Sequence, residues 1–219
     1  MLESDLVENI NNYLKRKGVR FTNEIRMGIG IPDISFNLGA NIRMTPVDNY
    51  FLISIFSFIN ERQQASFSEI KEAFQFSSEK VRKYVFELAN LCLVEVKNKV
   101  IKIIKNIFNY KLGVTFSIEA KLKDWKEAFI QAQRYQYFSD YSYAALPKDR
   151  IKNIDFNLYA KSGIGVLAID GKTVDEVLPP IKSSKCNNIQ KYICTSKVIE
   201  NSFKIKKRQL KSNIFTSYI

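Results

Sequence analysis

The helical pattern that interrupts a strand-rich sequence is the strongest constraint on how this chain folds. Alternation of apolar and polar residues, typical of strands, stops near residue 40 and resumes after residue 106, and helical spacing fills the region between. We therefore expect one α/β domain that carries a mostly helical insertion. The strand-like runs are FTNEIRM (21–27) and IPDISFNL (31–38), which Gly-Ile-Gly joins as a hairpin, and KLGVTFSIEAK (111–121).

The other core segments alternate between helix and strand. Apolar residues at helical spacing predict an amphipathic first helix over residues 2–17, which ends at Gly18. Asp124 is a predicted N-cap for the helix that follows the third strand. The predicted order from there is helix 125–138, strand 142–147, helix 149–162, strand 165–170 and a turn at Asp170-Gly171.

The inserted region contains three predicted helices and a hairpin. Its first helix lies within residues 47–63, with Thr45 or Asp48 as its cap, and a capping box of Ser66 and Glu69 opens the second at 66–74. A third helix follows at 77–91, and the runs LVEV and VIKII then form a hairpin around Lys97-Asn98-Lys99.

This order of elements resembles a winged helix-turn-helix domain over residues 46–105. The resemblance implies that the third helix enters the major groove of DNA and that the hairpin is the wing. Winged helices also serve as protein-docking modules, so this alternative stays open. The DNA-binding residues that the resemblance implies are Lys80, Arg82 and Lys83 on the third helix and Lys97 and Lys99 on the wing.

The charge of the chain favours a polyanionic partner. The net charge is +12 and the sequence pI is about 9.5. Within residues 182–211 there are nine Lys or Arg residues and one acid, Glu200, so we expect a basic C-terminal segment over 182–219. Such a charge balance binds nucleic acid through the release of counterions.

The composition also narrows the chemistry and the location. The chain has no histidine, which excludes Ser-His and Cys-His nucleophiles and imidazole metal ligands. Its three cysteines are too few and too widely spaced to indicate a zinc site or a disulfide framework. The N-terminus is polar and acidic, and the longest apolar run is too short to cross a bilayer. We expect a soluble, cytoplasmic protein with no membrane contact.

Asp33, Glu119 and Lys121 lie on neighbouring predicted strands of the α/β domain when the inserted region is left out of the sequence. Pro32-Asp33 then lies on a strand next to Glu119-Ala120-Lys121, where the period of two projects Glu119 and Lys121 to the same side. This pattern resembles the PD-(D/E)xK superfamily of nucleases, with 85 residues between its two halves instead of a short hairpin. The resemblance implies a restriction-endonuclease-like α/β fold, a mixed β-sheet flanked by helices, formed by residues 1–45 and 106–181.

The resemblance also implies roles for further residues. In many members the first helix supplies a metal-binding carboxylate, for which Glu3 fits best and Glu8 competes, while Glu24 is a further candidate that Arg26 could instead neutralise. On the helix after the catalytic strand, Gln131 and Tyr135 form the Q-x-x-x-Y pattern of RecB-type nucleases, and Gln133 and Tyr137 repeat the spacing. The implied catalytic set is Asp33, Glu119, Lys121, Gln131 and Tyr135, and the implied metal ligands are Asp33, Glu119 and Glu3.

These residue types suit metal-dependent hydrolysis of phosphodiesters. Carboxylate oxygens are the ligands that Mg²⁺ prefers, and Mn²⁺ can replace it. A lysine beside the metal can orient the attacking water and stabilise charge on the phosphate. The expected function is a metal-dependent DNA endonuclease, as in restriction or defence. Whether it acts as a homodimer, and whether RNA is also a substrate, stay open. The alternative is a non-catalytic DNA-binding regulator or structural protein on the same scaffold.

Overall fold

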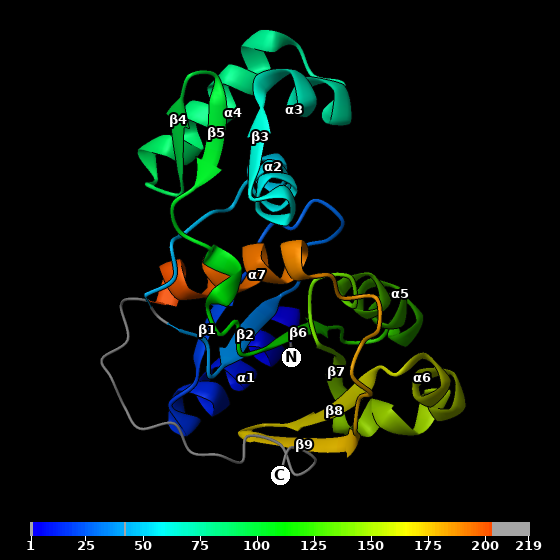
Figure 1. Ribbon diagram of the computed structural model, residues 1–219. Coiled ribbons are helices and arrows are strands. Elements are labelled where there is room, and N and C mark those ends of the chain that lie inside the picture. The colour runs from blue at the N-terminus through cyan, green and yellow to red at the C-terminus, as the bar shows by residue number, and fades with distance from the viewer. Residues whose placement is uncertain (1, 42, 203–219) are drawn as a thin grey trace. The chain divides into compact units, whose positions relative to one another are not determined.

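The computed structural model describes residues 2–41 and 43–202, and its contacts divide the chain into two compact units. Unit 1 contains the residues up to 42 and those from 112 onward, and unit 2 contains residues 43–111 (Figure 1). The sequence placed these boundaries at 45/46 and 105/106. The difference consists of the connecting segments on both sides of the insertion.

Unit 1 is built on a six-stranded mixed sheet with the strand order β1-β2-β6-β7-β8-β9. Strands β6, β7 and β8 are parallel to one another, and the other neighbouring pairs are antiparallel. This arrangement confirms the α/β class. The strands are β1 (Arg20–Asn23), β2 (Ile34–Leu38), β6 (Val114–Ala120), β7 (Tyr141–Pro147), β8 (Gly165–Asp170) and β9 (Thr173–Leu178).

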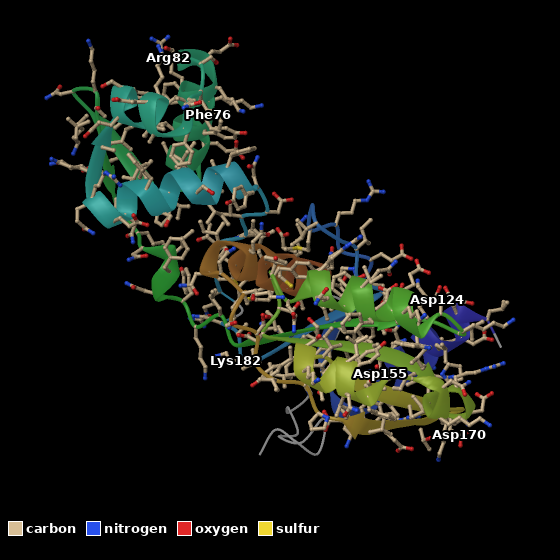
Figure 2. All side chains as sticks on the ribbon, turned by 90° about the vertical axis from the view of Figure 1, so that its right-hand side faces the viewer. Phe76, Arg82, Asp124, Asp155, Asp170 and Lys182 are labelled. Atoms are coloured by element: carbon tan, nitrogen blue, oxygen red, sulfur yellow. The ribbon has the colours of Figure 1, made fainter. Side chains whose placement is uncertain are left out.

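Four α-helices belong to the described part of unit 1, and their ends follow local side-chain chemistry. Gly18, with a φ of 73°, ends the first helix, as the sequence predicted. Asp124 and Asp155 cap the next two by accepting the backbone N–H of Glu127 and of Leu158 (Figure 2). The helices are α1 (Glu3–Lys17), α5 (Trp125–Tyr135), α6 (Phe156–Ser162) and α7 (Asn188–Ser202), and the predicted helix 149–162 divides into a 3₁₀ segment, η2 (Lys148–Asn153), and α6.

Helices cover both faces of the sheet, so alternate residues of its central strands enter different cores. On one face, Leu6, Ile10 and Leu14 of α1 are fully buried against the sheet, where the rings of Phe36 and Phe116 stack with centroids 4.5 Å apart. On the other face, a second core joins α5, α6 and the opposite side of β7 and β8; it includes Ala128, Ala132, Tyr159, Ala144 and Val166. Burial on both sides holds the strand ends in place.

The basic C-terminal segment differs from its prediction, because its first part is a core helix. Tyr192, Cys194 and Val198 of α7 are fully buried, and the helix packs against β1 and β2. Lys191 extends to the buried carboxylate of Asp140 at 2.7 Å. The apolar residues of 188–202 thus form a buried stripe that the count of lysines concealed. The cluster Lys204, Lys206, Lys207, Arg208 and Lys211 lies outside the described residues.

Unit 2 contains the three predicted helices and the predicted hairpin, together with one strand that was not expected. The capping box of Ser66 and Glu69 is confirmed, whereas Asn49, instead of Thr45 or Asp48, caps the first helix by accepting two backbone N–H groups. The added strand β3 pairs with β5, giving the sheet order β3-β5-β4. The elements are α2 (Tyr50–Arg62), β3 (Gln64–Ser66), α3 (Phe67–Phe74), α4 (Ser78–Asn90), β4 (Val94–Lys97), β5 (Val100–Ile103) and the 3₁₀ segment η1 (Ile107–Asn109).

Among the helices that the structure describes, none is both long and apolar enough to reach from one side of a membrane to the other.

Candidate active site

The pairing of β2 with β6 brings the two halves of the acidic pattern together across the insertion. The strands are antiparallel, with Ile34 opposite Ile118, so Asp33 lies at the end of β6 that carries Glu119. The Asp33 carboxylate accepts a 2.7 Å hydrogen bond from the backbone N–H of Ala120. The start of β2 and the end of β6 therefore share one site, as the sequence predicted.

Glu119 is the most enclosed acidic group of this site. Its side chain is only 2% exposed, because β6 is covered on both faces. The Lys121 ammonium lies 2.8 Å from one carboxylate oxygen, and the Tyr135 hydroxyl donates to the other at 2.5 Å. Each oxygen of Glu119 thus has a donor, which offsets much of the cost of burying the charge.

Burial affects the pKa of all three charged groups. Burial is the largest cause of the raised pKa of Asp33, although the Ala120 N–H and the charge of Lys121 oppose it. Burial, followed by the charge of Asp33, raises the pKa of Glu119. For Lys121, burial acts to lower the pKa, but the hydrogen bond and charge of Glu119 outweigh it and the pKa is raised. Lys121 is therefore a cation in this site, next to two carboxylates that repel each other.

The first helix contributes Glu3 at the rim of the site. One oxygen of Glu3 accepts the backbone N–H of Leu122 at 3.4 Å, and the other lies 3.9 Å from the Lys121 ammonium. Glu8 is exposed on α1, and no described contact links it to Asp33 or Glu119. Glu24 has a positive φ of 52° and donates its backbone N–H to the Asp33 carbonyl at 3.3 Å. Of the three candidates, Glu3 is the one that contacts the lysine.

Tyr135 reaches the site from the last residue of α5. Its hydroxyl lies 3.1 Å from the Ile31 carbonyl as well as 2.5 Å from Glu119. Burial is the largest cause that raises the pKa of Tyr135, so the phenol keeps the proton that it donates to the carboxylate. The single proton favours the shorter, charge-assisted contact with Glu119.

Gln131 does not join this cluster. Its amide donates to Glu127, one turn earlier on α5, at 2.9 Å, and no described contact links it to Glu119. The second Q-x-x-x-Y pair, Gln133 and Tyr137, does not reach Glu119 either. Tyr137 is 48% exposed, and Gln133 lies near Gln136 and Ser162. The structure therefore brings Tyr135, but neither glutamine, to the predicted carboxylate.

Gly30 is a site residue that sequence reasoning missed. A Cβ added at Gly30 would lie 2.7 Å from a ring carbon of Tyr135, so any side chain there would require the ring or the loop to shift. Glycine at this position lets the loop cover the tyrosine without such a shift. The available signal is the Gly-Ile-Gly run, whose hairpin pattern does not indicate the contact with Tyr135.

The carboxylate oxygens of this site suit a hard cation, although the number of carboxylates is small. Within residues 2–41 and 43–202, no three His, Cys, Asp or Glu side chains form a group that could hold a metal ion. Buried Glu119 and half-buried Asp33 form a pair of oxygen donors, and Glu3 is engaged with Leu122 and Lys121. Two desolvated carboxylates with raised pKa values are groups that a divalent cation would stabilise.

The predicted DNA-binding residues of unit 2 differ in how they are held. Arg82 and Lys83 are exposed on α4 (Figure 2). Lys80 lies over the ring of Phe76, 3.9 Å from its centroid, and Lys97 pairs with Glu95 at 2.8 Å. Lys99 lies in the tip of the hairpin with a φ of 65°. All five are basic groups on one helix or one hairpin, as the sequence predicted.

Comparisons with known proteins identify no relative of established function. No family model and no curated protein matches the sequence. A solved structure, the SPO1766 protein of unknown function from Silicibacter pomeroyi, is similar at 17% sequence identity and a TM-score of 0.29. The similarity covers 42% of this chain and 56% of the SPO1766 chain, so this chain spans little more than half the length of SPO1766.

A pH dependence of stability follows from the two raised carboxyl pKa values. Above the ordinary values of 3.8 and 4.5, the folded protein holds more protons than the unfolded chain, so stability falls as the pH rises through the raised values. In EDTA, we expect the free energy of unfolding to fall by up to about 1.4 kcal/mol per pH unit for each titrating carboxyl. Glu119→Gln should reduce that slope.

Urea unfolding at pH 4 to 7 measures the slope. Glu127→Gln, on the exposed side of α5, is the matched control and should keep the wild-type slope. If Glu119→Gln and Glu127→Gln give the same slope as the wild type, Glu119 does not have the burial described above.

Substitution of Gly30 should act on Glu119 through the tyrosine. The Tyr135 hydrogen bond lowers the pKa of Glu119, and a Cβ at residue 30 would displace the ring. Gly30→Ala and Tyr135→Phe should therefore both raise the pKa of Glu119, as followed by carbon-13 NMR of its carboxyl group. Ile29→Ala is the control, because it changes an exposed side chain next to Gly30. An unchanged pKa in Gly30→Ala, alongside a raised one in Tyr135→Phe, would contradict the contact.

Proposed function

We propose that this protein is a metal-dependent deoxyribonuclease that hydrolyses phosphodiester bonds at Asp33, Glu119 and Lys121. The observation that carries the proposal is the convergence of a buried carboxylate (Glu119), a half-buried one (Asp33) and a protonated lysine at one sheet edge, from segments 85 residues apart. Surface ion pairs are exposed and contribute little to stability, whereas Glu119 is almost fully enclosed. Charged groups that are withdrawn from water in this way are more typical of a functional site than of a solvated surface.

Each residue has a role that its geometry suits. Asp33 and Glu119 would hold Mg²⁺, or Mn²⁺ in its place, with Glu3 as the nearest further carboxylate. When bound, the ion would acidify a water molecule and offset the charge that develops on the phosphate. Lys121, as a cation with three N–H donors, can orient the attacking water and bind a phosphate oxygen. Tyr135 holds one oxygen of Glu119, and so keeps that carboxylate turned toward Lys121.

We further propose that unit 2 is a winged helix that binds DNA. Its order of helix, strand, two helices and hairpin supports this proposal, because β3 supplies the third strand that such domains use. The side chains of Arg82, Lys83 and Lys99 have no hydrogen bond or ion pair among the described residues, so they can contact phosphates without losing a partner. Lys80 and Lys97, held by Phe76 and Glu95, would contribute less. Cutting both strands of a duplex would require a homodimer or two successive cuts.

The competing proposal is a DNA-binding protein that does not cleave. The pairing of Lys121 with Glu119 at 2.8 Å favours it, because the lysine neutralises a charge that a metal would otherwise compensate. Measurements of DNA cleavage and of DNA binding distinguish the two proposals. Only the nuclease proposal requires Glu119 once DNA is bound.

The test uses the full chain with Mg²⁺ and with duplex, branched and single-stranded DNA. We expect cleavage by the wild type and a loss on the order of 10²- to 10³-fold in Glu119→Gln and in Lys121→Met. DNA affinity in both variants should stay within about twofold, and Glu127→Gln should cleave like the wild type. Charge reversal at Arg82 and Lys83 should weaken binding itself.

Two results would contradict the nuclease proposal. One is a wild type that binds DNA and Mg²⁺ and leaves all three substrates intact. The other is equal cleavage by the wild type and by Glu119→Gln, which would place the activity elsewhere.

A further inference from the structure

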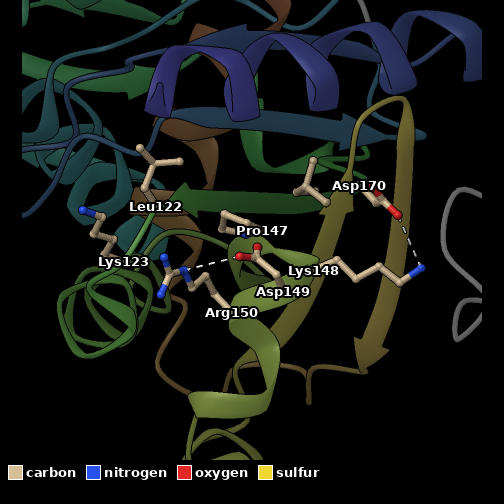
Figure 3. A pocket seen from close by; sticks show the side chains of 8 residues that line it. Leu122, Lys123, Pro147, Lys148, Asp149, Arg150 and Asp170 are labelled. Carbon is tan, nitrogen blue, oxygen red and sulfur yellow. Dashed lines mark ion pairs between the residues drawn. The ribbon is translucent and has the colours of Figure 1, made fainter. Parts of the chain in front are cut away.

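A pocket of about 640 Å³ opens next to the candidate active site in unit 1. It lies where β6, β7 and β8 end, since its lining includes Leu122, Pro147 and Asp170 (Figure 3). These three strands are parallel, so their carboxyl ends meet at the same edge. Ligands of α/β sheets bind preferentially at such an edge. The volume is in the range of pockets that hold small molecules or a nucleotide.

The pocket has an apolar base and a charged rim. Pro147 and Ile169 are buried and Leu122 is half-buried, so they form an apolar surface of the kind that a sugar or base can cover. Three cationic side chains stand around it, and all are exposed. They are Lys123, Lys148 and Arg150, which Figure 3 shows around the pocket together with Asp149 and Asp170.

The cations of this rim are only weakly engaged by the protein. Lys148 lies 3.7 Å from Asp170 and 3.8 Å from Asp175, and Arg150 lies 3.6 Å from Asp149. These separations exceed hydrogen-bond distance, and no side-chain hydrogen bond of the three cations exists among the described residues. The Lys123 side chain has neither a hydrogen bond nor an ion pair in that part of the chain. Exposed pairs of this kind are worth little, so an anion can displace them.

The position of the pocket relates it to the reaction. Lys121 and Glu119 precede Leu122 and Lys123 directly in the chain, and Glu3 accepts the N–H of Leu122. From β6 to β8 the sheet spans about 10 Å, at about 4.8 Å per strand. Phosphates follow one another every 3.4 Å along the axis of a duplex strand, so this span covers about three nucleotides.

We propose that this basic pocket binds an internal phosphate of the DNA strand that is cut, within about three nucleotides of the cleaved bond, and so sets the path of that strand. The proposal rests on the nuclease function of the adjacent site. The apolar base would cover the sugar of the same nucleotide, and the three cations would contact the phosphate. The pocket is thus a positioning site and takes no part in the bond cleavage.

The first test measures DNA affinity and its salt dependence in Ca²⁺, with the full chain carrying Lys123→Gln, Lys148→Gln and Arg150→Gln together. We expect affinity to fall about tenfold or more, similarly for all sequences, and the magnitude of the salt slope to fall by at least one. Lys152→Gln is the matched control, because Lys152 is exposed on η2 beside Arg150 and does not line the pocket. The three single variants identify the dominant cation. Wild-type affinity and slope in the triple variant would overturn the proposal.

The second test locates the phosphate. Neutral methylphosphonates replace single phosphates of a short oligonucleotide, one position at a time, in the wild type and in the triple variant. We expect one or two positions within about three nucleotides of the cut to weaken wild-type binding and to have no effect in the variant. Oligonucleotides with and without a terminal phosphate form the second arm. If the triple variant binds more weakly than the wild type only when the oligonucleotide carries a terminal phosphate, the assignment of an internal phosphate is overturned.

The outcomes separate this proposal from the nuclease function. Weaker binding in the triple variant, in a protein whose wild type cleaves nothing, would support the pocket and contradict the nuclease. Cleavage by the wild type, with unchanged KM and affinity in the triple variant, would support the nuclease and contradict the pocket. Among active variants, the pocket substitutions should raise KM and leave kcat within about twofold, unlike Lys121→Met.

Discussion

The hydrogen bond from the Ala120 N–H to the Asp33 carboxylate is the contact on which the proposed site depends. It joins two segments separated by the whole of unit 2, and its length of 2.7 Å is that of a strong, charge-assisted bond. The antiparallel register of β2 and β6 brings the partners together, and burial by α1 on one face and by α5 and α7 on the other keeps both strands in place. The carboxylates of Asp33 and Glu119 can therefore remain close despite their repulsion.

Much of this arrangement follows from local sequence rules. The period of two in β6 places Glu119 and Lys121 on one side, and the capping residues Ser66 and Asp124 mark helix starts through short-range hydrogen bonds. Gly30 and α7 depended instead on distant contacts. Gly30 faces a ring more than 100 residues away, and the lysines of 182–202 hid the apolar stripe that packs on β1 and β2. Gln131 differs from its prediction for a local reason, because its amide pairs with Glu127 in the same helix.

Opposing electrostatic effects decide what the site can do. Burial favours neutral carboxyl groups, whereas Lys121 and the donors of Ala120 and Tyr135 favour the charged forms, and burial is the larger effect at Asp33 and Glu119. A divalent cation would reverse that balance by stabilising both anions at once. The pocket beside them is lined by three cations and two carboxylates, so the sheet edge presents an acidic centre next to a rim with a small excess of positive charge. This combination suits a metal ion and a phosphate chain together.

Titration of Mn²⁺ into the protein, followed by electron paramagnetic resonance, tests the central claim most directly. We expect one specific site in the wild type, strong loss of binding in Asp33→Asn and in Glu119→Gln, and unchanged binding in Asp149→Asn, whose carboxylate lines the neighbouring pocket. Equal Mn²⁺ binding by the wild type, Asp33→Asn and Glu119→Gln would contradict this expectation, because the carboxylates of Asp33 and Glu119 would then not form the metal site.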